Sequence, residues 1–168
     1  MQAAKDSFFR ALQSRLATVN PARTITLDGA VRPAILVVEN EPYPSPKLFF
    51  NTFYVHWLGA SAIREFSGTL APRYSLTAQI EYFVKGTATL QRPFADRGRL
   101  IGQLDRELVE ILFPGSTEKM DHGAAPPTAL GSRLLWRWTP NFQTIADGGV
   151  FRRLTTVNVS FYLEVIPN

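Results

Sequence analysis

The two histidines are the residues of this 168-residue sequence best suited to acid–base chemistry. A serine hydrolase would need one of them beside a serine and a carboxylate. His56 lies in an aromatic segment, and residues 59–62 (Gly-Ala-Ser-Ala) carry part of a nucleophile-elbow pattern whose second glycine is replaced by Ile63. His122 follows Asp121 in a segment of small residues. We expect His56 to be a packed strand residue and Asp121-His122 a solvated loop pair, with a hydrolase as the distant alternative.

Other kinds of catalytic and metal site find no support in the residue types. The sequence contains no cysteine, which excludes disulfides, cysteine-ligated zinc and cysteine nucleophiles. It has no H-E-x-x-H zinc motif and no glycine-rich phosphate-binding motif. Three carboxylates, Asp105, Glu107 and Glu110, fall on one predicted helix, where we expect a solvated face rather than catalytic acids. The sequence thus predicts no enzyme, no catalytic residue, no metal site and no cofactor.

The basic residues point to a binding role. Lysine and arginine number 18 against 14 acidic residues, a formal net charge of +4. Segment 85–99 holds four of them beside a single acid, Asp96, and these four form a candidate basic surface: Lys85, Arg92, Arg97 and Arg99. One hypothesis is a nucleic-acid-binding module that uses this segment, because cations neutralise phosphates. The other interpretation is an ordinary basic surface with ion pairs, since no RNA-recognition or zinc-finger motif accompanies it.

Aromatic residues are numerous for a chain with few charges. They make up 12% of the sequence, and charged residues make up 19%. This balance indicates that part of the surface is buried against partners. The candidate interface residues are Phe49, Phe50, Trp136 and Trp138. The two tryptophans share one face of a predicted strand with Leu134, so sheet core is the alternative for them.

Two segments have the spacing of amphipathic helices. Apolar residues recur at every third or fourth position over 8–19, until a proline ends the pattern. The second helix is predicted over 97–113, with Asp96 as its N-cap. The four-residue spacing of Gly98 and Gly102 predicts close packing of this helix against a sheet. Both helices must therefore hold the residues above against a common core.

Strands account for most of the remaining chain, and they follow one another instead of alternating with helices. The predicted strands are 24–27, 34–39, 49–58, 74–85, 132–139 and 152–165. Asp28-Gly29 is a hairpin turn signal between the first two. This order, α-β-β-β-β-α-β-β, predicts one α+β domain over 1–168, a mostly antiparallel β-sheet packed by two amphipathic helices. We also expect a proline-rich loop at 40–47, a long loop at 116–131 and no membrane contact.

Four segments that follow a basic amphipathic helix resemble the tail terminator and tail completion proteins of tailed bacteriophages. They are RTITLDGAVRPAILVVENE, SLTAQIEYFVKGT, DRGRLIGQLDREL and LTTVNVSFYLEV, in a similarity that spans residues 7–165. The resemblance implies a structural protein that assembles into a homo-oligomeric ring, often a hexamer, on the end of the tail tube. Such a ring contacts the tail tube protein and the head-tail connector or neck protein, and DNA passes through its lumen. The implied location is the virion tail or neck, assembled in the host cytoplasm.

Overall fold

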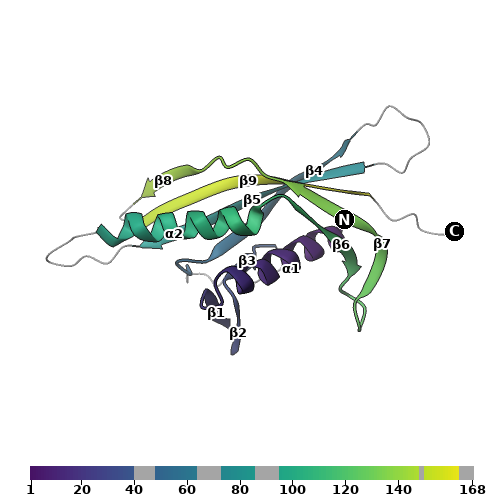
Figure 1. Ribbon diagram of the computed structural model, residues 1–168, viewed down its shortest axis with the longest axis horizontal. Helices are drawn as coiled ribbons and strands as arrows, with labels where there is room; N and C mark the ends of the chain where they lie inside the picture. Colours follow the sequence, from purple (N-terminus) through teal and green to yellow (C-terminus); the bar gives the residue numbers. More distant parts are fainter. Residues whose placement is uncertain (40–47, 64–72, 86–94, 148–149, 163–168) are drawn as a thin grey trace.

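The computed structural model describes residues 1–39, 48–63, 73–85, 95–147 and 150–162, which form two helices and nine strands (Figure 1). The helices are α1 (Gln2–Val19) and α2 (Ala95–Leu112). The strands are β1 (Thr24–Leu27), β2 (Ala30–Pro33), β3 (Ile35–Val37), β4 (Phe53–Ile63), β5 (Arg73–Lys85), β6 (Gly115–Asp121), β7 (Thr128–Arg137), β8 (Gln143–Asp147) and β9 (Val150–Tyr162). Neither helix is both long and apolar enough to cross a membrane, within the residues described.

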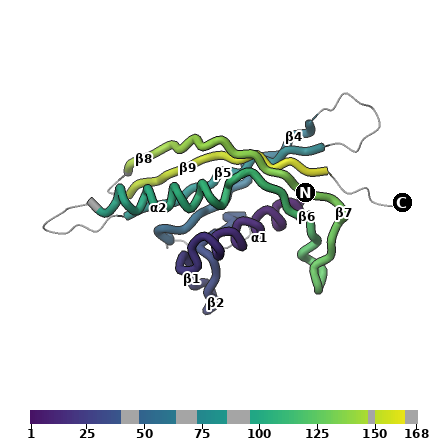
Figure 2. Tube along the Cα trace, in the orientation of Figure 1, coloured from purple at the N-terminus to yellow at the C-terminus, as the bar shows by residue number. Residues whose placement is uncertain are grey.

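Seven of the strands form one sheet, in the order β3-β4-β5-β9-β7-β6, with β8 paired to β9 beside the end of β7. The pair β1–β2 is a separate small sheet. All pairs are antiparallel except β3–β4. In Figure 2 the β6–β7 hairpin turns away from the long strands β5 and β9. The predicted α+β fold, a mostly antiparallel sheet with two helices, is confirmed.

The core lies between the two helices and one face of the sheet. Strand β5 buries every second residue, namely Leu76, Ala78, Ile80, Tyr82 and Val84. The apolar stripes of the helices join the same cluster, through Phe8, Leu12 and Leu16 of α1 and Leu104, Leu108, Ile111 and Leu112 of α2. The alternate residues of the strand and the apolar stripes of the two helices therefore pack against one another in a single core.

Arg15 connects α1 with α2 and the β6–β7 hairpin. Its Nη1 atom donates to the main-chain carbonyls of Ile111, at 3.0 Å, and Phe113, at 2.7 Å. These carbonyls belong to the C-terminal end of α2, whose last turn contains no basic residue of its own. The guanidinium carbon also lies 4.6 Å from the centre of the Trp136 ring. The Arg15 guanidinium thus donates hydrogen bonds to carbonyls that the helix leaves unpaired, and it supplies the positive charge that a helix C-terminus favours.

Ser7 covers the outer edge of the sheet at β6. Its hydroxyl accepts a hydrogen bond from the N–H of Met120 at 2.9 Å and lies 3.4 Å from the carbonyl of the same residue. Ser7 is 3% exposed, so α1 shields this stretch of edge backbone from water. A side chain therefore takes the place of a further strand.

The partner of β1 differs from the prediction. Strand β2 begins directly after the turn, and the predicted 34–39 strand instead supplies β3, which runs parallel to β4. Asp28 and Gly29 have positive φ angles of 49° and 80°. A two-residue turn of this kind pairs the residues on either side of it, so Leu27 faces Ala30 and the hairpin closes at once.

The long loop predicted at 116–131 is wrong. Most of that segment belongs to the hairpin of β6 and β7, and only 122–127 connects the two strands. The pattern was hidden because β6 buries a lysine, Lys119, where an edge strand would normally bury an apolar residue. Strand β8 was not predicted, and the predicted proline-rich loop at 40–47 lies outside the described residues.

Helix α2 also differs in detail. It begins at Ala95, so Asp96 lies in its first turn rather than at the N-cap. Gly98 and Gly102 are exposed, and a Cβ atom at either position would meet no atom within 4 Å. The predicted packing of these glycines against the sheet is therefore wrong, because α2 turns its leucine stripe inward instead.

Gly115 is the glycine that the packing does require. A Cβ atom there would lie 2.8 Å from Cζ2 of Trp136 and would also meet the guanidinium of Arg15. We predict that Gly115→Ala lowers the free energy of unfolding by about 1–3 kcal/mol, the usual cost of overpacking. Gly102→Ala, which has open space around it, should raise that free energy by up to about 1 kcal/mol through helix propensity. Urea unfolding of both variants measures the contrast, and equal effects would contradict it.

Candidate functional site

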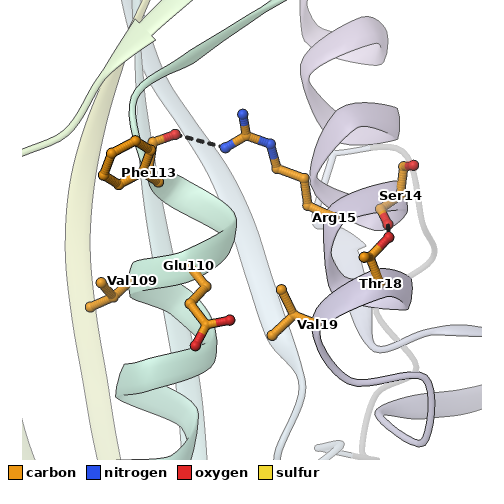
Figure 3. A pocket seen from close by; sticks show the side chains of 7 residues that line it. All are labelled: Ser14, Arg15, Thr18, Val19, Val109, Glu110 and Phe113. Carbon is orange, nitrogen blue, oxygen red and sulfur yellow. Dashed lines mark hydrogen bonds between the residues drawn. The ribbon is translucent and has the colours of Figure 1, made fainter.

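A groove with a volume of about 470 Å³ runs between α1 and α2 (Figure 3). Its lining residues are Ser14, Arg15, Thr18, Val19, Val109, Glu110 and Phe113. Figure 3 shows Arg15 and Val19 extending from α1 towards α2. Phe113 is 67% exposed and Val109 is 38% exposed, although both side chains are apolar. Large apolar side chains exposed beside a groove are typical of a surface that binds another protein.

Local structure explains why Phe113 remains on the surface. It directly follows α2, and Arg15 holds its main-chain carbonyl, which fixes the backbone where the helix ends. Its neighbours Ile111 and Leu112 take the inward positions of the last turn and are fully buried. On the other wall, the Thr18 hydroxyl donates to the carbonyl of Ser14 at 3.1 Å. The groove therefore combines a preformed backbone with apolar side chains that the protomer leaves partly uncovered.

The face of the sheet that the helices leave uncovered has different chemistry. The register of β4, β5 and β9 brings short uncharged polar residues together there: Ser61, Ser75, Thr77, Gln79, Thr156, Asn158 and Ser160. The hydroxyl of Thr77 donates to Oδ1 of Asn158 at 3.1 Å. The exposed side chain of Leu135 joins this face, because Leu135 pairs with Ser160. The protomer therefore presents an apolar groove on one side and, on the other, a polar sheet face that also carries the exposed Arg137 beside Asn158.

A buried carboxylate, Glu81, organises the charged residues of the same sheet face. Nε2 of His56 lies 2.7 Å from its Oε1, and Nε of Arg152 donates to its Oε2 at 2.6 Å. Glu81 is 3% exposed. Burial raises the pKa of Glu81, but the hydrogen bonds from His56 and Arg152 outweigh burial and hold that pKa below its usual value.

His56 is a strand residue, as predicted, and its described partner is Glu81. Ser61, the serine of the partial elbow pattern, lies five residues further along β4 and pairs with Ser75. At about 3.3 Å per strand residue the two side chains are roughly 15 Å apart, too far for proton transfer. His122 lies in the turn after β6, on another part of the molecule. The structure does not bring these candidate catalytic residues together.

Two carboxylates of α2 are not in the solvated face that the sequence predicted. Asp105 pairs with Arg153 at 2.6 Å and accepts a hydrogen bond from the Tyr82 hydroxyl. Burial, reinforced by Asp105, raises the pKa of Tyr82 above its usual value. Arg152 and Arg153 thus face opposite sides of the sheet, as strand alternation predicts.

Glu107 is the second of these carboxylates and is 5% exposed. It pairs with Arg23 at 2.8 Å and accepts a hydrogen bond from the side chain of Asn20 at 2.7 Å. Burial raises the pKa of Glu107, but the hydrogen bonds from Arg23 and Asn20 outweigh it, so the pKa is lowered. Only Glu110, of the three predicted acids, is exposed. The pairing of Glu107 across 84 residues has no local signal in the sequence.

The candidate interface residues separate into two groups. Trp136 and Trp138 are 2% and 7% exposed and lie in the core, so the sheet-core alternative describes them. The indole N–H of Trp138 donates to the hydroxyl of Thr155 at 2.9 Å. Phe49 and Phe50 are half-buried, and Phe49 packs on a small cluster that includes Tyr54. The exposed apolar residues of the groove were missed because Val109 lies in an otherwise amphipathic helix and Phe113 directly follows it.

The candidate basic surface is only partly described. Lys85 and Arg99 are exposed, and Arg92 lies outside the described residues. The guanidinium of Arg97 lies 4.7 Å from the centre of the Phe151 ring. Lys85 pairs with Val150, the residue before Phe151, so these basic groups occupy the same end of the sheet. The described residues include no group of three histidine or acidic side chains that could hold a metal ion.

The Glu81 cluster predicts a pH dependence of stability. Glu81→Gln should lower the free energy of unfolding at pH 7 by about 1–3 kcal/mol, because Arg152 and His56 lose a charged acceptor. The pKa of Glu81 is lowered in the folded state, so its contribution is present above its ordinary value of 4.5 and is lost as the pH falls further. Urea unfolding at pH 7, 5 and 3.5 should show the wild type and the variant converging at low pH. Glu110→Gln is the exposed control, and a pH-independent difference for Glu81→Gln would contradict the prediction.

No protein-family model and no curated protein matches the chain.

Proposed function

We propose that this protein is a structural virion component, a ring-forming tail terminator that caps the tail tube and joins it to the head-side connector. The observation that carries the proposal is the presence of two surfaces of different chemistry on one protomer. The α1–α2 groove exposes Phe113 and Val109, whereas the opposite sheet face is polar and also carries charged side chains. A head-to-tail ring needs two such different surfaces, since each subunit contacts its neighbours through unlike patches.

The exposed apolar residues of the sheet side support this arrangement. Leu135 is 49% exposed and Leu58 is 58% exposed, on strands that do not line the groove. Insertion of such side chains into the groove of the next copy would bury apolar surface on both partners. The contact is heterologous, so repeated copies form a ring when the rotation between them closes. The sequence resemblance gives the ring its expected place, on the tail tube and against the neck protein, with DNA passing through the lumen.

The proposal predicts the effect of a charge in the groove. Phe113→Glu should convert the oligomer to a monomer of unchanged circular dichroism, because a carboxylate in an apolar contact loses its hydration. Val31→Glu is the matched control, since Val31 is 69% exposed but lies on the separate β1–β2 sheet. Native mass spectrometry and negative-stain imaging measure the state of each variant. A wild type that remains a monomer and never joins purified tail tubes overturns the proposal.

The nucleic-acid-binding module is the second candidate, and the exposure of Lys85 at the end of β5 and of Arg99 on α2 is the observation in its favour. DNA binding that weakens steeply with salt, and that the double change Lys85→Gln and Arg99→Gln removes, would support this function. A wild-type ring with no salt-dependent DNA affinity would exclude it.

A further inference from the structure

A second hollow, of about 370 Å³, lies between α1 and the β6–β7 hairpin. Arg10 and Arg15 line it from the helix, and Ser116, Thr117, His122 and Trp136 line it from the hairpin side. It is separate from the apolar groove, although Arg15 contributes to both. Its lining is rich in cationic and hydroxyl groups, which is the chemistry that recognises an anion.

Two of the residues that line this hollow have a ring nitrogen with no hydrogen-bond partner among the residues that the structure describes. These nitrogens are Nε1 of Trp136 and Nε2 of His122, and both atoms are buried. Trp136 is 2% exposed, so its indole N–H has lost water without gaining a protein acceptor. A buried donor left in this state costs about 1–3 kcal/mol, and native structures usually supply it with a partner. An acceptor from outside the chain would remove this cost.

The two guanidinium groups also lack a counter-charge. Arg15 contacts main-chain carbonyls and an aromatic ring, and Arg10 donates to Oε1 of Gln13 at 3.4 Å. Neither forms an ion pair with a described residue. Burial lowers the pKa of Arg15, as expected for a cation that is partly removed from water.

Glu118 is the one acidic residue that lines the hollow, and its charge opposes an anion there. It is exposed, and the strand register places it directly opposite Arg133. Opposite charges at facing positions of an antiparallel pair attract one another. The hollow with its surroundings therefore has an excess of positive charge.

We propose that this hollow is a binding site for an oxyanion, either a phosphate or a carboxylate group, held by Arg10 and Arg15. The anion accepts charge-assisted hydrogen bonds from the two guanidinium groups and supplies the acceptor that the Trp136 indole lacks. Arginine suits this role because its planar donors match the spacing of phosphate and carboxylate oxygens. The site does not depend on the proposed ring, since all its residues belong to one protomer.

Indole N–H signals in a ¹⁵N-labelled protein provide the test. The chain has three tryptophans, and Trp138, whose N–H is bonded to Thr155, is an internal control. Titration with sodium phosphate, and separately with sodium succinate, at constant ionic strength should shift the Trp136 signal saturably and leave Trp138 unchanged. The anion that saturates at the lower concentration identifies the source of the oxyanion.

Two variants make the test specific. Arg10→Gln should raise the midpoint of the titration about tenfold, the effect of losing one charge-assisted hydrogen bond. Arg106→Gln, an exposed arginine on α2 outside the hollow, should leave it unchanged. Arg15 is kept, because it also holds the end of α2. The proposal is overturned if neither anion shifts the Trp136 signal, if Trp138 shifts equally, or if both variants behave alike.

Discussion

The guanidinium of Arg15 is the contact on which the arrangement of the helices depends. It packs on the ring of Trp136 and donates hydrogen bonds to two carbonyls at the end of α2. It also occupies the space that a side chain at residue 115 would need. One side chain therefore binds a helix end, packs on the face of a buried indole ring and leaves room only for glycine at residue 115. Arg15 lines both the α1–α2 groove and the hollow beside the hairpin, so the same cation contributes to an apolar groove and to a polar one.

Charge in this protein is distributed by long-range pairing. Glu81, Asp105 and Glu107 each find an arginine from a distant part of the chain, on both faces of the sheet. These pairs tie α2 to β9 and to the segment after α1. Because a buried carboxylate without its partner is costly, they fix which strands and helices can lie together. Arg10 and Arg15, beside the hairpin, form no ion pair with a residue that the structure describes.

Local patterns predicted what depends on local geometry. The helical spacing over 8–19, the alternation of β5 and the opposite directions of Arg152 and Arg153 all follow from the period of one element. The Asp28-Gly29 turn was recognised, but its partner was not, because residues 34–37 suit a strand in either sheet. Strand β6 was missed since its buried residue is a lysine. The α1–α2 groove and the hollow beside the hairpin form where α1 packs against other elements, and the periodicity of a single segment does not predict that packing.

The hydroxyl of Ser7 has a consequence for how copies of this chain can associate. An exposed edge strand is a template on which identical chains add strands without limit, as in amyloid. The Ser7 hydroxyl accepts a hydrogen bond from the outward N–H of Met120, near the end of that strand, and so this N–H is not available to a further strand. Growth by sheet extension through β6 is thus interrupted at the level of a single protomer. Association through this part of the molecule is then left to side chains on the faces of the fold.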